Sequence, residues 1–326
     1  MFRLFFISVF TLFSKTLCLG QPNLVPNPGF EEFSQCPSDI GQTILAIPWI
    51  DPTNASSDYF NLCSLNSNPF SNCFGIQAPY SGNAFVGLYA MISMGSNNRE
   101  YIQVKLKEPL LSNVEYCIEF FVSLSDSSDY AVNNIGCLFS IDPIYTPTYP
   151  TNVINIIPQI INNGSLNPLT NKNDWQKIEG SFTASGGECY LTIGNFFKDD
   201  ESDTVFVGGS NYSSCGYGAS YYFIDNVSVK LCSFLEPIIE IPNLFSPNND
   251  GYNDIYYIHL DNVLNYDMNI YNRWGLQIKS LSIHDSIWDG KYNGISLPEG
   301  VYFYTLNYKN LQGETFSVHG IIHLIR

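Results

Sequence analysis

Short runs of apolar, β-branched and aromatic residues, bounded by Gly, Pro, Asn or Ser, recur along residues 21–233. Such runs predict β-strands, because a strand needs only a few residues and its side chains alternate between two faces. The expected strands are 84–89, 115–124, 135–141, 177–183, 190–193 and 221–230. One segment, 151–162, has a helix-length apolar pattern, but Pro158 interrupts it. We therefore predict an all-β domain, and a jelly-roll β-sandwich is the favoured architecture.

A second β domain is expected at the C-terminal end. Its length fits an immunoglobulin-like β-sandwich of roughly seven strands. A hydrophobic content of 45% is enough for packed cores and excludes a disordered chain. Two prolines within 234–243 predict a linker there. Residues 301–308 alternate, which should put four side chains on one face of the strand: Tyr302, Tyr304, Leu306 and Tyr308.

Residues 1–20 have the features of a cleavable secretory signal. Arg3 is a short basic region, residues 4–13 are an apolar run, and small residues precede Gln21. Lipidation at Cys18 is disfavoured, because no small residue stands directly before it. No segment reaches the roughly 18 apolar residues of a transmembrane helix. We expect an exported chain with no transmembrane span.

Removal of the signal leaves eight of the nine cysteines, all before residue 233: Cys36, Cys63, Cys73, Cys117, Cys137, Cys189, Cys215 and Cys232. An even number in an exported protein favours disulfides, although spacing alone does not assign the pairs. Zinc is the alternative, but residues 21–236 contain no histidine and no C-x-x-C pair.

Acidic residues dominate the chain, with 30 Asp and Glu against 14 Lys and Arg and a net charge of −16. An acidic chain without a basic patch argues against nucleic acid and anionic lipid as partners, and it is compatible with divalent cations.

Catalytic groups are scarce in the first domain. All four histidines follow residue 258, so the first domain has no Ser-His-Asp or Cys-His site. A carboxylate pair of the glycosidase type would need two acids at a defined separation. No spacing singles out two of the candidates, Glu31, Glu32, Asp58, Glu119, Asp126, Asp129 and Asp225. We predict that the protein is not an enzyme; a secreted, carboxylate-dependent glycan-active enzyme is the alternative.

Five ordered motifs close the chain, at 244–254, 268–275, 287–294, 297–304 and 320–326. Together they resemble the gliding-motility-associated C-terminal domain of Bacteroidota proteins, which is the type B sorting domain of the type IX secretion system. The resemblance implies a sorting domain at 244–326. It also implies export by Sec and then across the outer membrane, to the cell surface or the medium, with the type IX machinery as partner.

The first domain carries a second resemblance, in residues 23–32, 174–182 and 221–229. These segments look like strands of carbohydrate-binding-module jelly rolls with a galactose-binding-like fold. The resemblance implies a structural calcium ion shared by Glu31 or Glu32 and Asp225, with a hydrogen-bonded structural role as the alternative. It also implies a disulfide between Cys36 and Cys63. The other six cysteines would then pair within residues 73–232.

Two loops could hold a cation. Asn248, Asp250 and Asp254 match part of a calcium loop, but Asn-Asp-Gly is also common in turns. The acidic run 199–203 is interpreted as a solvated loop, with a loose cation site as the alternative.

Glycan binding would need exposed aromatic platforms. The candidates are Trp49, Tyr59, Tyr80, Trp175, Tyr212, Tyr217 and Tyr221, of which Tyr59 and Tyr80 lie in expected loops. Arg273 beside Trp274 is either a recognition patch for the exporter or a structural arginine against a buried tryptophan. The leading hypothesis is a non-enzymatic surface or secreted protein whose jelly roll binds a glycan or cell-surface ligand. A purely structural envelope protein is a further alternative.

Overall fold

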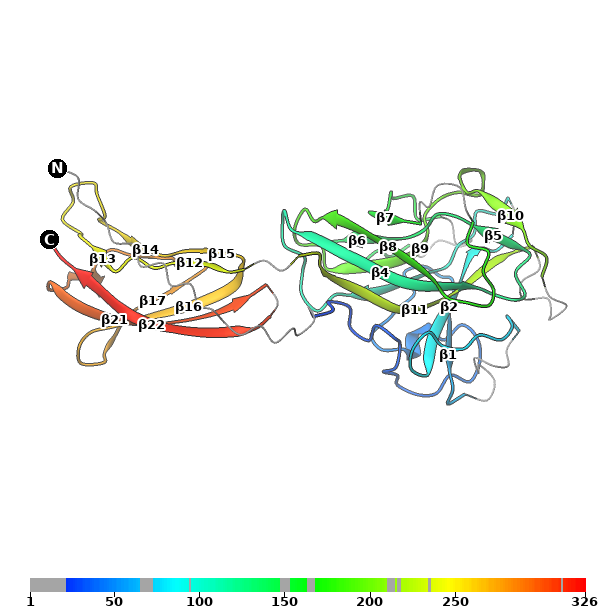
Figure 1. Cartoon of the computed structure of the whole chain (residues 1–326), viewed down its shortest axis with the longest axis horizontal. Coiled ribbons are helices and arrows are strands. Elements are labelled where there is room, and N and C mark those ends of the chain that lie inside the picture. Colours follow the sequence, from blue (N-terminus) through cyan, green and yellow to red (C-terminus); the bar gives the residue numbers. More distant parts are fainter. Residues whose placement is uncertain are drawn as a thin grey trace. The chain divides into compact units, whose positions relative to one another are not determined.

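The computed structural model describes residues 22–64, 73–93, 95–146, 153–162, 168–209, 215, 218–233, 236–311 and 313–326. It contains two compact units, one comprising Asn23–Ser233 and the other including Phe234–Arg326 (Figure 1). The predicted signal peptide lies outside the described residues. Among those described, no helix is long and apolar enough to cross a membrane.

Two sheets of antiparallel strands form the first unit. The larger has the order β1 (Asp58–Asn61), β2 (Ala84–Met91), β11 (Ser220–Leu231), β4 (Glu115–Leu124), β8 (Gln176–Thr183). The smaller has the order β3 (Tyr101–Lys105), β9 (Tyr190–Asn195), β6 (Ile135–Ser140), β7 (Ile160–Ile161). A separate pair, β5 (Tyr130–Val132) and β10 (Thr204–Phe206), and two short 3-10 helices, η1 (Thr43–Leu45) and η2 (Asp199–Glu201), complete the unit.

The prediction of strands is confirmed for this unit. All six expected segments are strands, and β4 has the predicted bounds. The described part of 151–162 contains no helix, as the proline at 158 led us to expect.

The inward faces of both sheets form one hydrophobic core. On β4, Ile118, Phe120 and Val122 alternate with side chains on the outer face, and they pack in the same cluster as Leu191 and Ile193 of β9. Burying each such side chain contributes roughly 1.5–3 kcal/mol. The core therefore leaves the alternate residues of β4 free to form the outer face of the larger sheet.

The second unit is also all-β. Its main sheet has the order β13 (Leu244–Phe245), β22 (Thr315–Leu324), β21 (Gly300–Asn310), β16 (Val263–Tyr271), β17 (Gln277–Ser282). Three strand pairs accompany it: β12 (Ile238–Glu240) with β15 (His259–Asp261), β14 (Tyr256–Tyr257) with β18 (Ile287–Trp288), and β19 (Lys291–Tyr292) with β20 (Ile295–Ser296). The predicted alternation on 301–308 is confirmed, because the four expected side chains are buried. Trp288 packs among the rings of Phe245, Tyr256 and Tyr302.

The segment expected to be a linker contributes a strand. Residues 238–240 form β12, which pairs with β15 of the second unit, and Ile239 packs against that unit's core. The second unit thus begins before residue 244. The physical reason is that Ile239 and Ile241 have apolar side chains that gain from burial, whereas a free linker would leave them in water.

Candidate functional site

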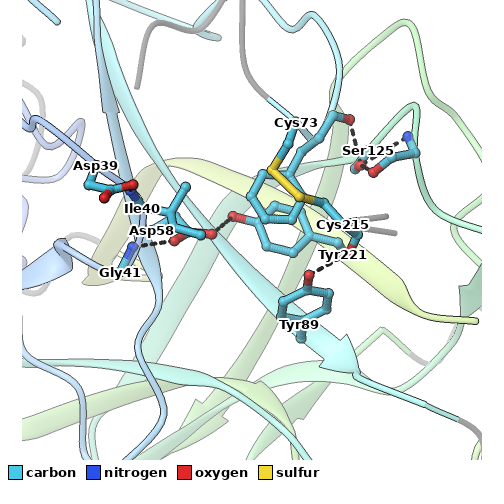
Figure 2. Close-up of a disulfide and its surroundings, with 11 residues drawn as sticks. Asp39, Ile40, Gly41, Asp58, Cys73, Tyr89, Ser125, Cys215 and Tyr221 are labelled. Carbon is cyan, nitrogen blue, oxygen red and sulfur yellow. Dashed lines mark hydrogen bonds between the residues drawn. A yellow bond between two sulfur atoms is a disulfide. The ribbon is translucent and has the colours of Figure 1, made fainter. Parts of the chain in front are cut away.

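The outer face of the larger sheet has two different parts. In the first part, five aromatic side chains form a second buried cluster: Phe60, Phe74, Phe85, Tyr221 and Phe223. The Phe74 ring stacks on Tyr221 with centroids 3.8 Å apart. The disulfide Cys73–Cys215 packs against this cluster, beside Tyr221 (Figure 2). This part of the face is therefore closed, and its aromatic residues pack a core.

The second part of the face is open and contains a pocket of about 390 Å³. Strand β11 has a β-bulge next to the pocket. Its register with β4 shifts between Asp225 and Ser228, and Asn226 within the bulge has a positive φ of 52°. The disulfide Cys117–Cys232 borders one end. The lining residues are Cys117, Ile118, Glu119, Glu179, Gly180, Ser181, Ser228, Lys230 and Leu231.

The pocket combines acceptors and donors of hydrogen bonds. Glu119 of β4 lies directly opposite Ser228 of β11 on one side and Glu179 of β8 on the other. Two carboxylates on adjacent strands repel each other. Lys177 lies 2.6 Å from Glu179 and partly offsets that charge, and Lys230 adds a second cation to the lining. Such a mixed surface suits a ligand rich in hydroxyl groups, which can both donate and accept.

Two stacked aromatic rings, those of Tyr80 and Phe121, lie beside the pocket. Phe121 follows Glu119 by two residues on β4, so it lies on the same face. Tyr80 stacks on Phe121 with centroids 3.7 Å apart and stays 44% exposed. Trp175 meets Tyr80 edge to face at 6.3 Å and donates its indole N–H to the Ala78 carbonyl at 2.9 Å. Tyr80 thus lies where a platform for a ligand would be useful, next to the pocket.

The prediction for Tyr59 is wrong. Tyr59 lies in β1 with no exposed surface, and its hydroxyl donates to the Phe30 carbonyl at 2.8 Å. The segment expected to be a loop is a short strand. The serine residues that precede the strand masked its apolar pattern. Trp49 and Tyr221 are buried too, whereas Tyr212 and Tyr217 lie outside the described residues.

The two carboxylates proposed for calcium come together. Asp225 is buried and accepts the backbone N–H of Ser81 at 3.0 Å. Glu31 accepts the backbone N–H groups of Asn83 at 2.7 Å and Ala84 at 3.1 Å, in the same loop. Burial, with a smaller contribution from the charge of Glu31, raises the pKa of Asp225 to about 7. Neither carboxylate makes an ion pair within the described ranges, so a cation would relieve their repulsion.

The third candidate of this set, Glu32, has an exposed side chain. Its backbone N–H and carbonyl bond to the side chain of Asn27 at 2.9 and 2.8 Å. No group of three or more His, Cys, Asp or Glu side chains suited to a metal occurs in the part of the chain that the structure describes. Calcium here would thus rest on Glu31, Asp225 and backbone oxygens.

The loop at 248–254 is held by its own polar side chains. Asp254 accepts the backbone N–H groups of Asn248 and Gly251, each at 2.9 Å. The Asp250 N–H donates to the Asn248 side chain at 3.0 Å, and Gly251 has a φ of 86°. The turn interpretation accounts for these contacts, and a cation at this loop stays a prediction.

Of the eight cysteines that the structure describes, six pair and two do not. Cys36 and Cys63 form a disulfide with Cα atoms 5.8 Å apart, which is the pair that the resemblance implies. The expectation that all the others pair is wrong, because Cys137 and Cys189 are free. Cys137 lies on the inward face of β6, where burial raises the pKa of its thiol. A buried cysteine in a sheet behaves as a small apolar residue.

Three further carboxylates lie in or before β1 and β3, and sequence reasoning gave them no joint role: Asp58 and Glu100, which are buried, and Asp51, which is half-buried. Asp58 accepts the Tyr221 hydroxyl at 2.5 Å (Figure 2), and Glu100 accepts the Tyr89 N–H at 2.9 Å. Burial raises the pKa of Asp51 to about 7 and that of Asp58 to about 6. Burial also raises the pKa of Glu100, with the charge of Asp58 adding to it. The sequence signal that could have identified these buried acids is a charged residue directly beside an apolar run.

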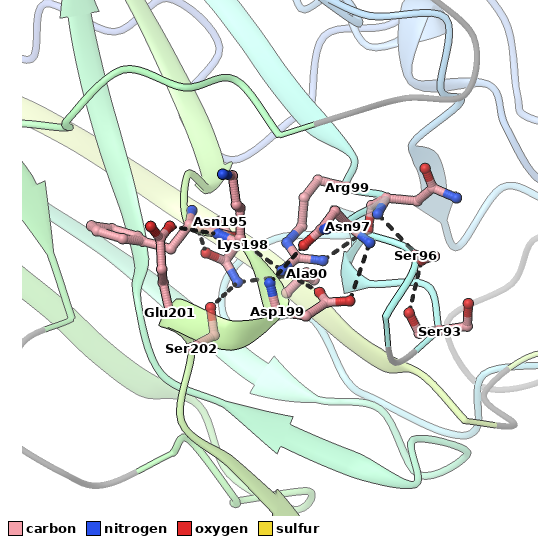
Figure 3. A network of polar contacts seen from close by, with 12 residues as sticks. Ala90, Ser93, Ser96, Asn97, Arg99, Asn195, Lys198, Asp199, Glu201 and Ser202 are labelled. Carbon is pink, nitrogen blue, oxygen red and sulfur yellow. Dashed lines mark hydrogen bonds and ion pairs between the residues drawn. The ribbon is translucent and has the colours of Figure 1, made fainter.

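The acidic run 199–203 is not simply a solvated loop. Asp199 forms an ion pair with the buried Arg99 at 2.7 Å (Figure 3). Asn97 and Asp199 also exchange hydrogen bonds, at 3.1 and 2.8 Å. Arg99 donates further to the Phe197 carbonyl at 2.9 Å. This network fastens the segment before β3 to η2, so Asp199 has a structural role.

The second unit matches the model of a known protein family. Residues 239–324 match the model of the CHU_C Type IX secretion signal domain. The match confirms the resemblance drawn from the C-terminal motifs, and it indicates export to the cell surface or the extracellular space. The matched range begins within β12, in agreement with the strand found in the expected linker.

Solved structures similar to the chain include binding and adhesin domains. The CBM22-1 xylan-binding domain of Paenibacillus barcinonensis Xyn10C is 12% identical, with a TM-score of 0.33, and the match covers 64% of this chain and 93% of that one. A cleaved adhesin domain of Lys-gingipain from Porphyromonas gingivalis is 13% identical, with a TM-score of 0.31 and coverage of 63% and 96%. The adhesin domain of Epf from Streptococcus pyogenes is 11% identical, with a TM-score of 0.35 and coverage of 94% and 97%. A search of curated proteins gives no match.

Proposed function

We propose that this is a secreted, non-enzymatic binding protein, whose first unit binds a glycan at the open part of its larger sheet. The observation that carries the proposal is the pocket of about 390 Å³ on that face, with Tyr80 and Phe121 beside it. Ligand sites are concave and combine apolar surface with a few polar groups. An exposed aromatic ring next to hydroxyl-binding groups suits a sugar, whose apolar face can stack while its hydroxyl groups hydrogen-bond.

Several charged side chains would fix the ligand. Glu119 and Glu179 would accept hydrogen bonds from sugar hydroxyl groups, and Lys230 would donate one. The two disulfides that flank the face, Cys73–Cys215 and Cys117–Cys232, join distant parts of the chain and would keep it preformed. A preformed site binds with less loss of conformational entropy.

A structural calcium ion is part of the proposal. Glu31 and Asp225 would hold it with backbone carbonyl oxygens, because calcium takes six to eight oxygen ligands. It would join the segment before η1, the loop before β2 and strand β11. Its effect would be on stability rather than on direct contact with a ligand.

The test uses the full chain and a glycan array, followed by calorimetric titration with any glycan that binds. We expect Glu119→Gln and Tyr80→Ala each to weaken binding by about tenfold or more, the effect of a single good contact. Asp142→Asn is the control, since Asp142 is an exposed carboxylate just after β6 of the smaller sheet and lies outside the pocket lining. Binding that survives both pocket substitutions, or that Asp142→Asn weakens equally, would contradict the assignment of this face.

One observation favours the alternative of a glycan-active enzyme. Glu119 and Glu179 lie opposite each other on neighbouring strands, and a retaining glycosidase uses two carboxyl groups about 5 Å apart. Incubation of each bound glycan with the wild-type chain, followed by mass spectrometry, separates the two functions. Cleavage that Glu119→Gln and Glu179→Gln both abolish would replace binding by hydrolysis.

A further inference from the structure

The hairpin turn between β16 and β17 presents an arginine and a tryptophan to solvent. Trp274 is 81% exposed, and the guanidinium of Arg273 lies 5.4 Å from the centre of its ring. The interpretation of Trp274 as a buried side chain is therefore wrong. A large aromatic ring held in water gains nothing from the core of its own domain. Trp and Arg are also the residue types that contribute most to protein interfaces.

The turn is rigid without a partner. The side-chain oxygen of Asn272 accepts the backbone N–H groups of Trp274 at 2.9 Å and Leu276 at 3.0 Å. The Gly275 N–H donates to the Asn272 carbonyl at 3.0 Å, and Gly275 has a left-handed φ of 78°. The backbone that carries Trp274 is thus ordered before any binding, which lowers the entropy lost when a partner docks.

An exposed apolar stripe continues from the turn across the sheet. Tyr271, at the end of β16, pairs with Phe303 of β21, and Phe303 pairs with Ile321 of β22. These residues alternate with the core residues, so they lie on the outer face. Phe303 is 45% and Ile321 43% exposed. The stripe and the turn form one surface, which we call the Trp274 surface: Tyr271, Arg273, Trp274, Phe303 and Ile321.

The charge of Arg273 is available for a partner. Lys279 pairs with Asp285 at 2.5 Å, and Lys291 pairs with Asp289 at 2.8 Å. Arg273 makes no ion pair to any residue that the structure describes. In a chain with a net charge of −16, this cation beside an apolar stripe complements an apolar cleft with carboxylates at its rim.

We propose that the Trp274 surface is where the type IX export machinery docks on the folded second unit. The partner is a protein of that machinery with an acid-rimmed apolar cleft, into which Trp274 inserts while Arg273 pairs with a carboxylate. The proposal rests on the proposed secretion of the chain, which residues 239–324 support through their family match. It adds that the machinery recognises a folded surface, and that one turn lies at the centre of this surface.

The test expresses the full chain in a bacterium that has a type IX system and compares its amount in cells and medium. The double variant Arg273→Ala, Trp274→Ala should lower the secreted fraction by about tenfold or more, as loss of a central interface contact does. Trp274→Phe keeps an aromatic ring and should restore most of the export. Ile283→Ala is the matched control, because Ile283 is 56% exposed at the other end of β17, about 20 Å from the turn at the rise of a strand.

Two further measurements make the outcome decisive. Melting of each purified variant checks folding, and Arg273→Glu, which leaves Trp274 in place, should block export if the double variant is unstable. Wild-type secretion of the double variant, with a chain truncated after residue 236 retained in the cell, would overturn the docking surface alone. Secretion of that truncated chain would instead overturn export through the second unit. Normal export followed by loss from the cell surface would also overturn the proposal, since the surface would then bind an envelope component.

Discussion

The ion pair between Arg99 and Asp199 offers a direct test of how the first unit is held together. Arg99 has no exposed side-chain surface, and Asp199 is 10% exposed. Asp199→Asn removes the negative charge and leaves the guanidinium buried without a counter-charge. Breaking a buried pair in this way costs about 3–5 kcal/mol. For a domain of this size, roughly 2–4 °C of melting temperature is lost per kcal/mol, so the fall should be about 6–20 °C.

Differential scanning calorimetry of the full chain measures this loss, since the two units can melt separately. The double variant Arg99→Met, Asp199→Asn removes both charges and should recover a large part of the loss, because no unpaired charge stays buried. Glu179→Gln breaks the solvent-exposed pair with Lys177 and should leave the melting temperature unchanged. A fall of less than about 2 °C for Asp199→Asn, or a double variant less stable than the single one, would refute the reasoning.

Three other predictions concern the buried acids and thiols of the first unit. Burial raises the pKa of Asp51 and Asp225 to about 7 and that of Asp58 to about 6, so the folded unit binds more protons than the unfolded chain between about pH 4 and 7. Its melting temperature should therefore fall as the pH rises from 4.5 to 8 without added calcium, and a rise would contradict this sign. Added calcium should raise the melting temperature at pH 8 after EDTA treatment, because binding at a hundredfold excess over the dissociation constant adds about 2.7 kcal/mol to the free energy of unfolding. Asp225→Ala should abolish the shift, and an unchanged wild-type midpoint would exclude the site. Alkylation without reduction should label two cysteines in denaturant, Cys137 and Cys189, and should spare Cys137 in the native chain; recovery of Cys137 in a disulfide would contradict the pairing.

Residue patterns that depend on the nearest neighbours were readable from the sequence. The alternation on β21 follows directly from the period of a strand, and the bounds of β4 follow from its apolar run. Asp225 and Glu31 were expected as a pair only through a resemblance, because no local pattern links two residues so far apart in the chain. The alternation on β21 and the bounds of β4 require no knowledge of which strand lies beside which.

What the sequence did not reveal depends on contacts between distant segments. Tyr59 was misplaced because a strand of four residues gives too little alternation to outweigh its serine-rich approach. The pocket arises where Glu119, Glu179 and Lys230 meet across three strands, and the pairing of β4 with both β11 and β8 brings them together. The partner of Asp199 lies a hundred residues earlier in the chain, in a buried arginine. No local pattern encodes such pairs.

The position of β11 has a consequence for the order in which the first unit can be made. β11 is its last strand in the chain, yet it lies between β2 and β4 in the larger sheet. The Leu24 N–H also donates to the Val229 carbonyl at 2.9 Å. The first residues of the unit therefore cannot complete their hydrogen bonds until β11 is present. A chain that emerges from a translocon N-terminus first cannot close this sheet until residue 231 is through. The unit should therefore remain unfolded during almost the whole of its passage and then fold slowly, through contacts between its two ends.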